Sequence, residues 1–224
     1  MGTFVSRFKS FKRRYIQLIT AVLYNCNIAG FVTGKIYKGN TKGVCVPGLN
    51  CYSCPGAVFA CPLGSLQGAI SKSVYTLPLY MLGTLLLFGV LFGRLICGFL
   101  CPFGLIQELL HKLPLPKIKK NRVTRMLSYL KYVILVIFAV IIPVVKLEPG
   151  FCKYICPAGT VEAGVPLVLS DKNLQSLIGG LFSWKVFVLV VCILICSMVY
   201  RAFCRFICPL GAIYSFFNPI SFFG

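Results

Sequence analysis

The chain has 224 residues, of which 58% are hydrophobic and only 12% are charged, and its formal net charge is +19. A soluble domain carries about 25% charged residues, so this composition excludes an ordinary soluble domain and indicates an integral membrane protein. The positive charge would also suit nucleic-acid binding, but the basic residues cluster beside apolar segments, a pattern that orients membrane proteins.

Four apolar segments approach the length of about 20 residues that a transmembrane helix needs. They run from about 15 to 34, 77 to 96, 127 to 145 and 184 to 203. A signal peptide would also start with a basic and an apolar region, but Asn25, Cys26 and Asn27 interrupt the first segment, and no convincing cleavage site follows. We therefore predict one all-α membrane domain over residues 1–224, with about four transmembrane helices.

The distribution of basic residues predicts how these helices are oriented. Basic residues precede the first segment and fill the connection between the second and third: Arg7, Lys9, Lys12, Arg13, Arg14, His111, Lys112, Lys117, Lys119, Lys120, Arg122 and Arg125. Loops rich in Lys and Arg stay in the cytoplasm, so both termini are expected there. Lys35, Lys38 and Lys42 lie in a loop expected outside and fit this rule less well.

A motif occurs twice, each time at the end of an apolar segment. GRLICGFLCPFGLIQ (93–107) aligns with YRAFCRFICPLGAIY (200–214), and the shared pattern is R-x2-C-x-F-x-C-P-x-G-x-I. The cysteines of the two copies are Cys97 and Cys101, then Cys204 and Cys208. The sequence therefore predicts two pseudo-repeated halves, at about 50–114 and 150–220, after an N-terminal helix at about 15–34.

The spacing of these cysteines favours ligation of an inorganic group. Cysteines four residues apart lie on one face of a helix. The proline after the second cysteine suits the first turn of a new helix, short and re-entrant or interfacial, whose free N–H groups would face the thiolate. Arg94 and Arg201, each three residues before the first cysteine of its pair, would add positive charge beside the ligands.

A looser repeat lies on the other side of the membrane. ACPLGSLQ (60–67) resembles ICPAGTVE (155–162), so that Cys61 matches Cys156, and Cys152 stands four residues before Cys156. The first copy has no cysteine at that position and offers Cys51 and Cys54 instead. Cys54 is favoured because a proline follows it, as after the other motif cysteines, and Cys51 is the alternative. Cys45 is either a spare ligand or a disulfide partner of Cys51.

Two sets of four thiols follow if the halves pack about a pseudo-two-fold axis, as repeats in membrane proteins often do. The inner set is Cys97, Cys101, Cys204 and Cys208, and the outer set is Cys54, Cys61, Cys152 and Cys156. A [4Fe–4S] cluster takes four cysteines, and zinc also accepts four thiolates. Sites on both faces favour electron transfer. The alternatives are a thiol–disulfide relay, which needs only one reactive pair per face, and a copper- or zinc-handling assembly factor.

Several other residues are expected to have ordinary structural roles. Cys26, Cys192 and Cys196 are expected to pack between helices, since small residues do so in membranes. His111 is the one histidine, which excludes bis-histidine haem ligation within this chain, and it is expected to be solvated. Gln67, Gln107 and Glu162 fall at matching places after their C-P-x-G motifs; helix packing is the default and a quinone contact the alternative.

NCYSCPGAVFACPLGSLQ, GRLICGFLCPFGLIQELLHKLP and YRAFCRFICPLGAIYSFF together resemble the membrane iron–sulfur family that includes NapH, NosR and CcoG. The resemblance covers nearly the whole chain from about Asn50. It implies an electron-transfer subunit of an oxidoreductase complex in the prokaryotic cytoplasmic membrane, carrying two [4Fe–4S] clusters. The expected partners are a ferredoxin-like or flavoprotein subunit and a terminal reductase, with a quinone as a further candidate cofactor.

Overall fold

The computed structural model describes residues 2–72, 79–118, 122–170 and 179–222. In these ranges the chain is helical, and the only β-type pairing is an isolated bridge between Cys45 and Ala60. The all-α prediction is therefore confirmed for the described part of the chain. Two features predicted from the sequence, the start of the second apolar segment at 77–78 and the basic residues Lys119 and Lys120, lie outside the described residues.

The first half consists of one long helix, a mostly irregular loop, and a run of four helices. The elements are α1 (Gly2–Tyr24), α2 (Ile28–Thr33), the 3-10 helix η1 (Asn40–Gly43), α3 (Pro62–Lys72), α4 (Leu79–Phe92), α5 (Leu95–Phe99) and α6 (Pro102–Leu110).

The second half repeats this order with a more broken first helix. Its elements are α7 (Arg122–Leu127), α8 (Leu130–Ile134), the π-helix η2 (Leu135–Ile141), α9 (Ile142–Lys146), α10 (Gly150–Tyr154), α11 (Pro157–Gly159), the π-helix η3 (Thr160–Gly164), α12 (Val165–Ser170), α14 (Gly180–Met198), α15 (Ala202–Phe206) and α16 (Pro209–Phe217).

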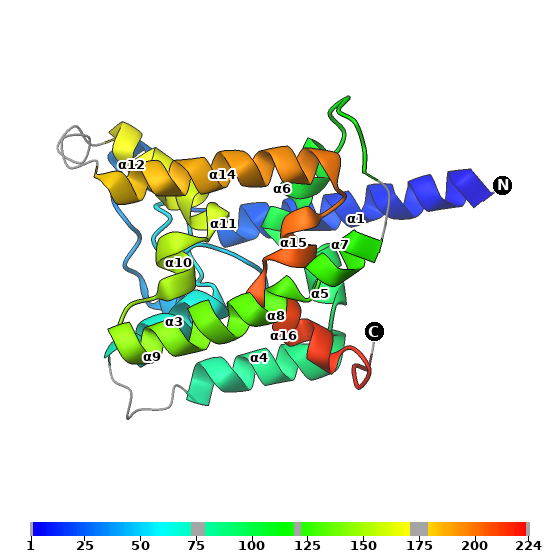
Figure 1. The fold of residues 1–224 in the computed structure, drawn as a ribbon. Coiled ribbons are helices and arrows are strands. Elements are labelled where there is room, and N and C mark those ends of the chain that lie inside the picture. Colours follow the sequence, from blue (N-terminus) through cyan, green and yellow to red (C-terminus); the bar gives the residue numbers. More distant parts are fainter. Residues whose placement is uncertain (1, 73–78, 119–121, 171–178, 223–224) are drawn as a thin grey trace.

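The long helices form the body of the molecule, and the short ones gather at its two ends (Figure 1). One end carries α5, α6, α15 and α16, together with the start of α1, whereas α3, α10 and α12 lie toward the other. Helix α1 packs against α5 and α6, and α16 packs against α4 and α8. The two C-x3-C-P motifs, at 97–102 and 204–209, therefore lie at the end of the molecule where α4 and α14 finish.

Two helical stretches are long and apolar enough to cross a membrane, Thr124–Lys146 and Gly180–Met198. Only 17% of the most apolar window of each is buried within the molecule. Large side chains such as Val136, Leu194 and, on the shorter apolar helix α4, Leu87 are more than half exposed. A soluble monomer rarely exposes such continuous apolar surface, which weakly indicates membrane association.

The first predicted segment, 15–34, differs from the structure. Helix α1 begins at Gly2 and ends at Tyr24, and a separate short helix starts at Ile28. The break follows from the two asparagines between them, whose side-chain amides bond to backbone carbonyls. Asn25 donates to the Ala21 carbonyl at 3.1 Å, and Asn27 donates to the Pro55 carbonyl at 3.0 Å, which ties the helix end to the following loop.

Candidate metal centres

Each of the four C-P-x-G motifs starts a helix at its proline, whereas no helix starts at Pro55 after Cys54. Cys101, Cys156 and Cys208 are the N-cap residues of α6, α11 and α16 and have extended backbone, with proline at the first helical position. Helix α3 begins in the same way at Pro62, directly after Cys61. The N-cap residue is where free N–H groups of the first turn converge, and the Gly211 N–H indeed donates to Cys208 Sγ at 3.4 Å. The predicted helix starts are confirmed.

The four cysteines of the predicted inner set come together between the two halves. Cys97 and Cys204 line a cavity of about 590 Å³ at the end of the molecule where α5 and α15 lie. The Cys101 and Cys97 thiols both raise the pKa of Cys204, in addition to the larger effect of burial. Cys204, Cys97 and Cys101 act in the same way on Cys208. Cys101 and Cys208 belong to one buried cluster, and Cys97 and Cys204 pack against it.

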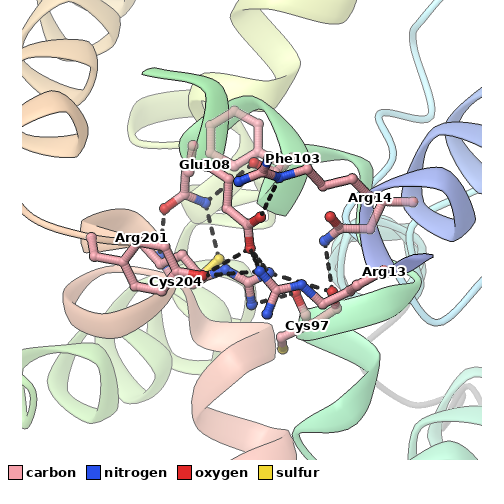
Figure 2. A network of polar contacts seen from close by, with 11 residues as sticks. Arg13, Arg14, Cys97, Phe103, Glu108, Arg201 and Cys204 are labelled. Atoms are coloured by element: carbon pink, nitrogen blue, oxygen red, sulfur yellow. Dashed lines mark hydrogen bonds and ion pairs between the residues drawn. The ribbon is translucent and has the colours of Figure 1, made fainter. Parts of the chain in front are cut away.

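A buried carboxylate holds the elements around this inner set (Figure 2). The side chain of Glu108 is 2% exposed, and its Oε1 lies 2.6 Å from Arg13 Nη2 and pairs with Arg201 Nη2. Tyr200 Oη donates to the same oxygen at 2.9 Å. Arg201 also donates to the Cys97 carbonyl oxygen at 3.2 Å. Glu108 thus connects α1 and α6 of one half to the Cys204 motif of the other.

Arg201 has a backbone conformation that non-glycine residues rarely adopt, with φ of 51°. Such a residue is strained by about 1–3 kcal/mol and persists only when its surroundings fix it. Here the Glu108 ion pair and the Cys97 carbonyl bond fix it. Arg94, at the matching place in the first motif, lines the same cavity, and both guanidinium groups lower the pKa of Cys97, which burial raises to about 12. Both arginines therefore lie beside the inner cysteines.

The outer cysteines line a second cavity of about 440 Å³, but the set differs from the favoured one. Its walls include Cys51, Cys61, Cys152 and Cys156, together with Lys185. Cys54 does not line it: the Cys54 side chain is fully buried, and its Sγ donates to Asn25 Oδ1 at 3.7 Å. Cys45 is buried beside the Ala60 backbone and is also absent from the walls. The geometry therefore brings together the alternative set with Cys51.

In three of the four C-P-x-G motifs, the residue six positions after the cysteine bonds to the other half. Gln107 Nε2 donates to Cys204 Sγ at 3.0 Å, and Glu162 Oε2 accepts from the Cys51 N–H at 2.7 Å. Tyr214, the fourth member of the series, donates to the Pro47 carbonyl oxygen at 3.0 Å. Gln67 is fully buried, and neither of its amide atoms has a hydrogen-bond partner. The sequence singled out Gln67, Gln107 and Glu162 by position, but it did not show that Gln107 and Glu162 bond to the other half.

The remaining singled-out residues lie away from the two cavities. Cys192 and Cys196 are buried in α14 with their sulfurs 3.9 Å apart, and Cys196 Sγ donates to Gln107 Oε1 at 3.7 Å. His111 is half-buried with its ring 5.5 Å from that of Tyr200, rather than fully solvated. Cys26 is exposed.

Comparison with known protein families shows which family the chain belongs to. Residues 74–121, 131–172 and 181–222, more than half of the chain, match the family described as "4Fe-4S binding domain". The chain belongs to this family. The iron–sulfur prediction and the internal repeat are thereby confirmed, whereas the narrower resemblance to NapH and NosR stays a prediction.

Two similar proteins come from Methanocaldococcus jannaschii, and both are uncharacterised. MJ0750 is 30% identical over 165 residues, which cover 70% of this chain and 60% of MJ0750. MJ0749 is 29% identical over 139 residues, which cover 58% of this chain and 44% of MJ0749. This chain thus spans about half the length of these relatives. No solved structure matches it significantly.

The cysteine sets of this 4Fe-4S binding protein leave room for a group larger than one ion. Among the described residues, no three Cys, His, Asp or Glu side chains lie close enough to bind a single metal ion. The C-P-x-G glycines supply part of the space: a Cβ at Gly64 would lie 3.6 Å from Cys152 Sγ, and one at Gly159 would lie 3.6 Å from Cys51 Sγ. Four thiols on the wall of one cavity of about 440 Å³, with close backbone approach at these glycines, fit the four-cysteine ligation of a [4Fe–4S] cluster.

Burial makes these thiols poor anions in the absence of iron. It raises the pKa of Cys51 to about 12 and that of Cys61 to about 11, in the latter case against hydrogen bonds from Gly64 and Leu63. Burial also raises the pKa of Glu162 to about 7, which the bond from the Cys51 N–H opposes. Metal coordination deprotonates a thiol outright, so the sites suit four thiolates bound to iron.

Proposed function

We propose that the protein is a membrane electron-transfer subunit with two [4Fe–4S] clusters. Cys97, Cys101, Cys204 and Cys208 would hold the inner cluster, and Cys51, Cys61, Cys152 and Cys156 the outer one. The observation that carries the proposal is that cysteines of both halves meet at each cavity: Cys51, Cys61, Cys152 and Cys156 line the outer one, and Cys97 and Cys204 line the inner one. Such clusters exchange single electrons at potentials set by hydrogen bonds and nearby charge.

The proposed location is the prokaryotic cytoplasmic membrane, with several transmembrane helices and both termini in the cytoplasm. The apolar surfaces of α4, α14 and the stretch Thr124–Lys146 support it. The basic connection between the halves, which includes Lys112, Lys117 and Arg125, also supports this location, because loops rich in Lys and Arg stay in the cytoplasm. The inner cavity would then open toward the cytoplasm.

The inner cavity is proposed as the entry point for electrons. Four cationic side chains, Arg94, Lys131, Arg201 and Arg205, line it beside the Cys97 and Cys204 sulfurs. Complementary charge steers a partner and sets its orientation, so the cations suit an acidic ferredoxin-like or flavoprotein subunit. A quinol is the alternative donor. A terminal reductase or another redox protein would accept electrons at the outer face.

A thiol–disulfide relay is the second candidate, because Cys192 and Cys196 place their sulfurs 3.9 Å apart. It predicts that the protein exchanges disulfides with a thioredoxin-like donor and needs no iron. The copper- or zinc-handling alternative predicts a tightly bound single metal ion per site.

Electron paramagnetic resonance (EPR) of the anaerobically purified, dithionite-reduced protein tests the proposal. Two [4Fe–4S] signals are expected, and replacing Cys97 by Ser should remove one while replacing Cys152 by Ser removes the other. A protein that shows no iron–sulfur signal after anaerobic reconstitution with iron and sulfide would exclude the electron-transfer function.

A further inference from the structure

Residues 46–50, which we name the bridging segment, lie between the two cysteine sets. All five are buried, and Asn50 is fully so. The segment is neither helix nor strand. Irregular backbone normally runs over the surface, because its polar groups need partners. Its position inside the molecule is therefore supported by specific contacts on both sides.

On one side the segment rests against the inner motif. A Cβ at Gly48 would lie 2.8 Å from the Leu100 carbonyl oxygen and 3.3 Å from both Cys101 Cα and Pro102 Cδ. Only glycine lets the backbone approach this closely. The segment therefore lies in direct contact with the backbone that presents Cys101.

On the other side the segment is hydrogen-bonded to the residues that precede Cys61. The Val46 N–H donates to the Ala60 carbonyl at 3.0 Å, and Asn50 Nδ2 donates to the Phe59 carbonyl at 3.2 Å. Cys61 follows these two residues directly. The bridging segment thus lies between a cysteine of the inner set and a cysteine of the outer set.

Two consecutive amides point to these two cysteines. Leu49 and Asn50 lie beside Cys61 on the wall of the outer cavity. Burial raises the pKa of both thiols, whereas the Leu49 N–H lowers that of Cys101 and the Asn50 N–H lowers that of Cys61. The two amide nitrogens are joined through one Cα and one carbonyl carbon. A short stretch of covalently bonded backbone therefore lies between Cys101 and Cys61.

A tyrosine from the second half fixes the segment. Tyr214 is fully buried, and its hydroxyl donates to the Pro47 carbonyl oxygen at 3.0 Å. Tyr214 lies in α16, one helical turn and more after Cys208. The segment is therefore held by cysteine-bearing elements of both halves.

We propose that the bridging segment is the electron path between the two clusters, through the backbone of Leu49 and Asn50. This inference rests on the proposed function. One electron moves from the reduced cluster of one set to the oxidised cluster of the other; the first is oxidised by one electron, the second is reduced by one, and no bond forms or breaks. Tunnelling decays less steeply through bonded atoms than across a gap, so pushing the segment away from the Cys101 backbone at Gly48 should slow the transfer.

The experiment compares Gly48→Ala with Gly43→Ala in the full chain, reconstituted with iron and sulfide in lipid nanodiscs. A Cβ at Gly43 meets nothing within 4 Å, so this variant is the matched control. The readouts are the rate at which an electron passes between the clusters after rapid partial reduction, the spin–spin broadening in EPR when both are reduced, and each midpoint potential. If Gly48→Ala does not assemble, Tyr214→Phe replaces it, with Tyr37→Phe as its control.

Gly48→Ala is expected to keep both clusters, to slow inter-cluster transfer several-fold, and to weaken the spin–spin broadening. The midpoint potential of the inner cluster should also fall, because the Leu49 N–H would lie farther from the Cys101 sulfur and stabilise its negative charge less. Gly43→Ala should match the parent protein. Unchanged rate and broadening in Gly48→Ala and in Tyr214→Phe, with both clusters present, would overturn the inference alone. A parent protein without clusters would overturn the proposed function instead.

Discussion

Replacing Glu108 by Gln should be among the most destabilising single changes in this protein. The Glu108 side chain is 2% exposed and pairs with Arg13 and Arg201, which are 26% and 16% exposed. Arg14 Nε lies 3.7 Å from Glu108 Oε2, and the Arg14 side chain is 38% exposed. This pair therefore adds little to the stability. The substitution leaves a partly buried pair of guanidinium groups without a counter-charge.

The expected loss follows from the burial of these groups. Removing one partner of a buried ion pair costs about 3–5 kcal/mol. Because water reaches part of each arginine, we expect the low end, ~3 kcal/mol, which corresponds to on the order of a hundredfold in the unfolding equilibrium. The matched control is Glu148→Gln. Glu148 also pairs at 2.6 Å, with Lys153, but its side chain is 40% exposed, so its replacement should change the free energy of unfolding far less.

The free energy of unfolding would be measured on detergent-solubilised protein by titration with sodium dodecyl sulfate, followed by circular dichroism. Burial alone raises the pKa of Glu108, but Arg201, Tyr200 and Arg13 hold it below the usual value of 4.5. The stabilisation is therefore fully present above about pH 4.5 and is lost as the pH falls through the folded-state pKa. The parent and Glu108→Gln should converge in acid. Equal losses for Glu108→Gln and Glu148→Gln at pH 7 would refute this reasoning.

Three further outcomes are expected. Cys51→Ser should abolish the outer EPR signal whereas Cys54→Ser keeps it, and the reverse result would restore the set favoured from sequence. Gln107→Leu removes the bond to Cys204 Sγ and should lower the inner midpoint potential in a redox titration while leaving the outer one in place; equal shifts at both sites would contradict this. Cys192→Ala should retain both clusters by iron analysis, since the polar contact of that thiol in the described part of the chain is with Cys196 Sγ, and loss of a cluster would assign it a larger role.

Much of the architecture followed from local chemistry in the sequence. A proline directly after a cysteine marks a first helical turn, which is why the helix starts at Pro102, Pro157 and Pro209 were predictable. The repeat of R-x2-C-x-F-x-C-P indicated equivalent halves. These features depend on neighbours along the chain, and the sequence displays such neighbours directly.

Features that depend on packing between distant segments were harder to predict from the sequence. The choice between Cys51 and Cys54 rested on the proline after Cys54, but the loop turns so that Cys51 lines the cavity and Cys54 contacts Asn25. The break after Tyr24 had a sequence signal in Asn25 and Asn27, and its side-chain bonds were the deciding feature. The Glu108 network joins residues from both halves, and no local pattern indicates its partners.

The iron and acid-labile sulfide content of the anaerobically purified chain tests the central claim most directly. Two four-cysteine sites, each with one [4Fe–4S] cluster, require about eight iron and about eight sulfide per chain. That content should fall to about four of each in Cys204→Ser and likewise in Cys152→Ser. Iron without sulfide, or a content that neither substitution lowers, would contradict the two-cluster account.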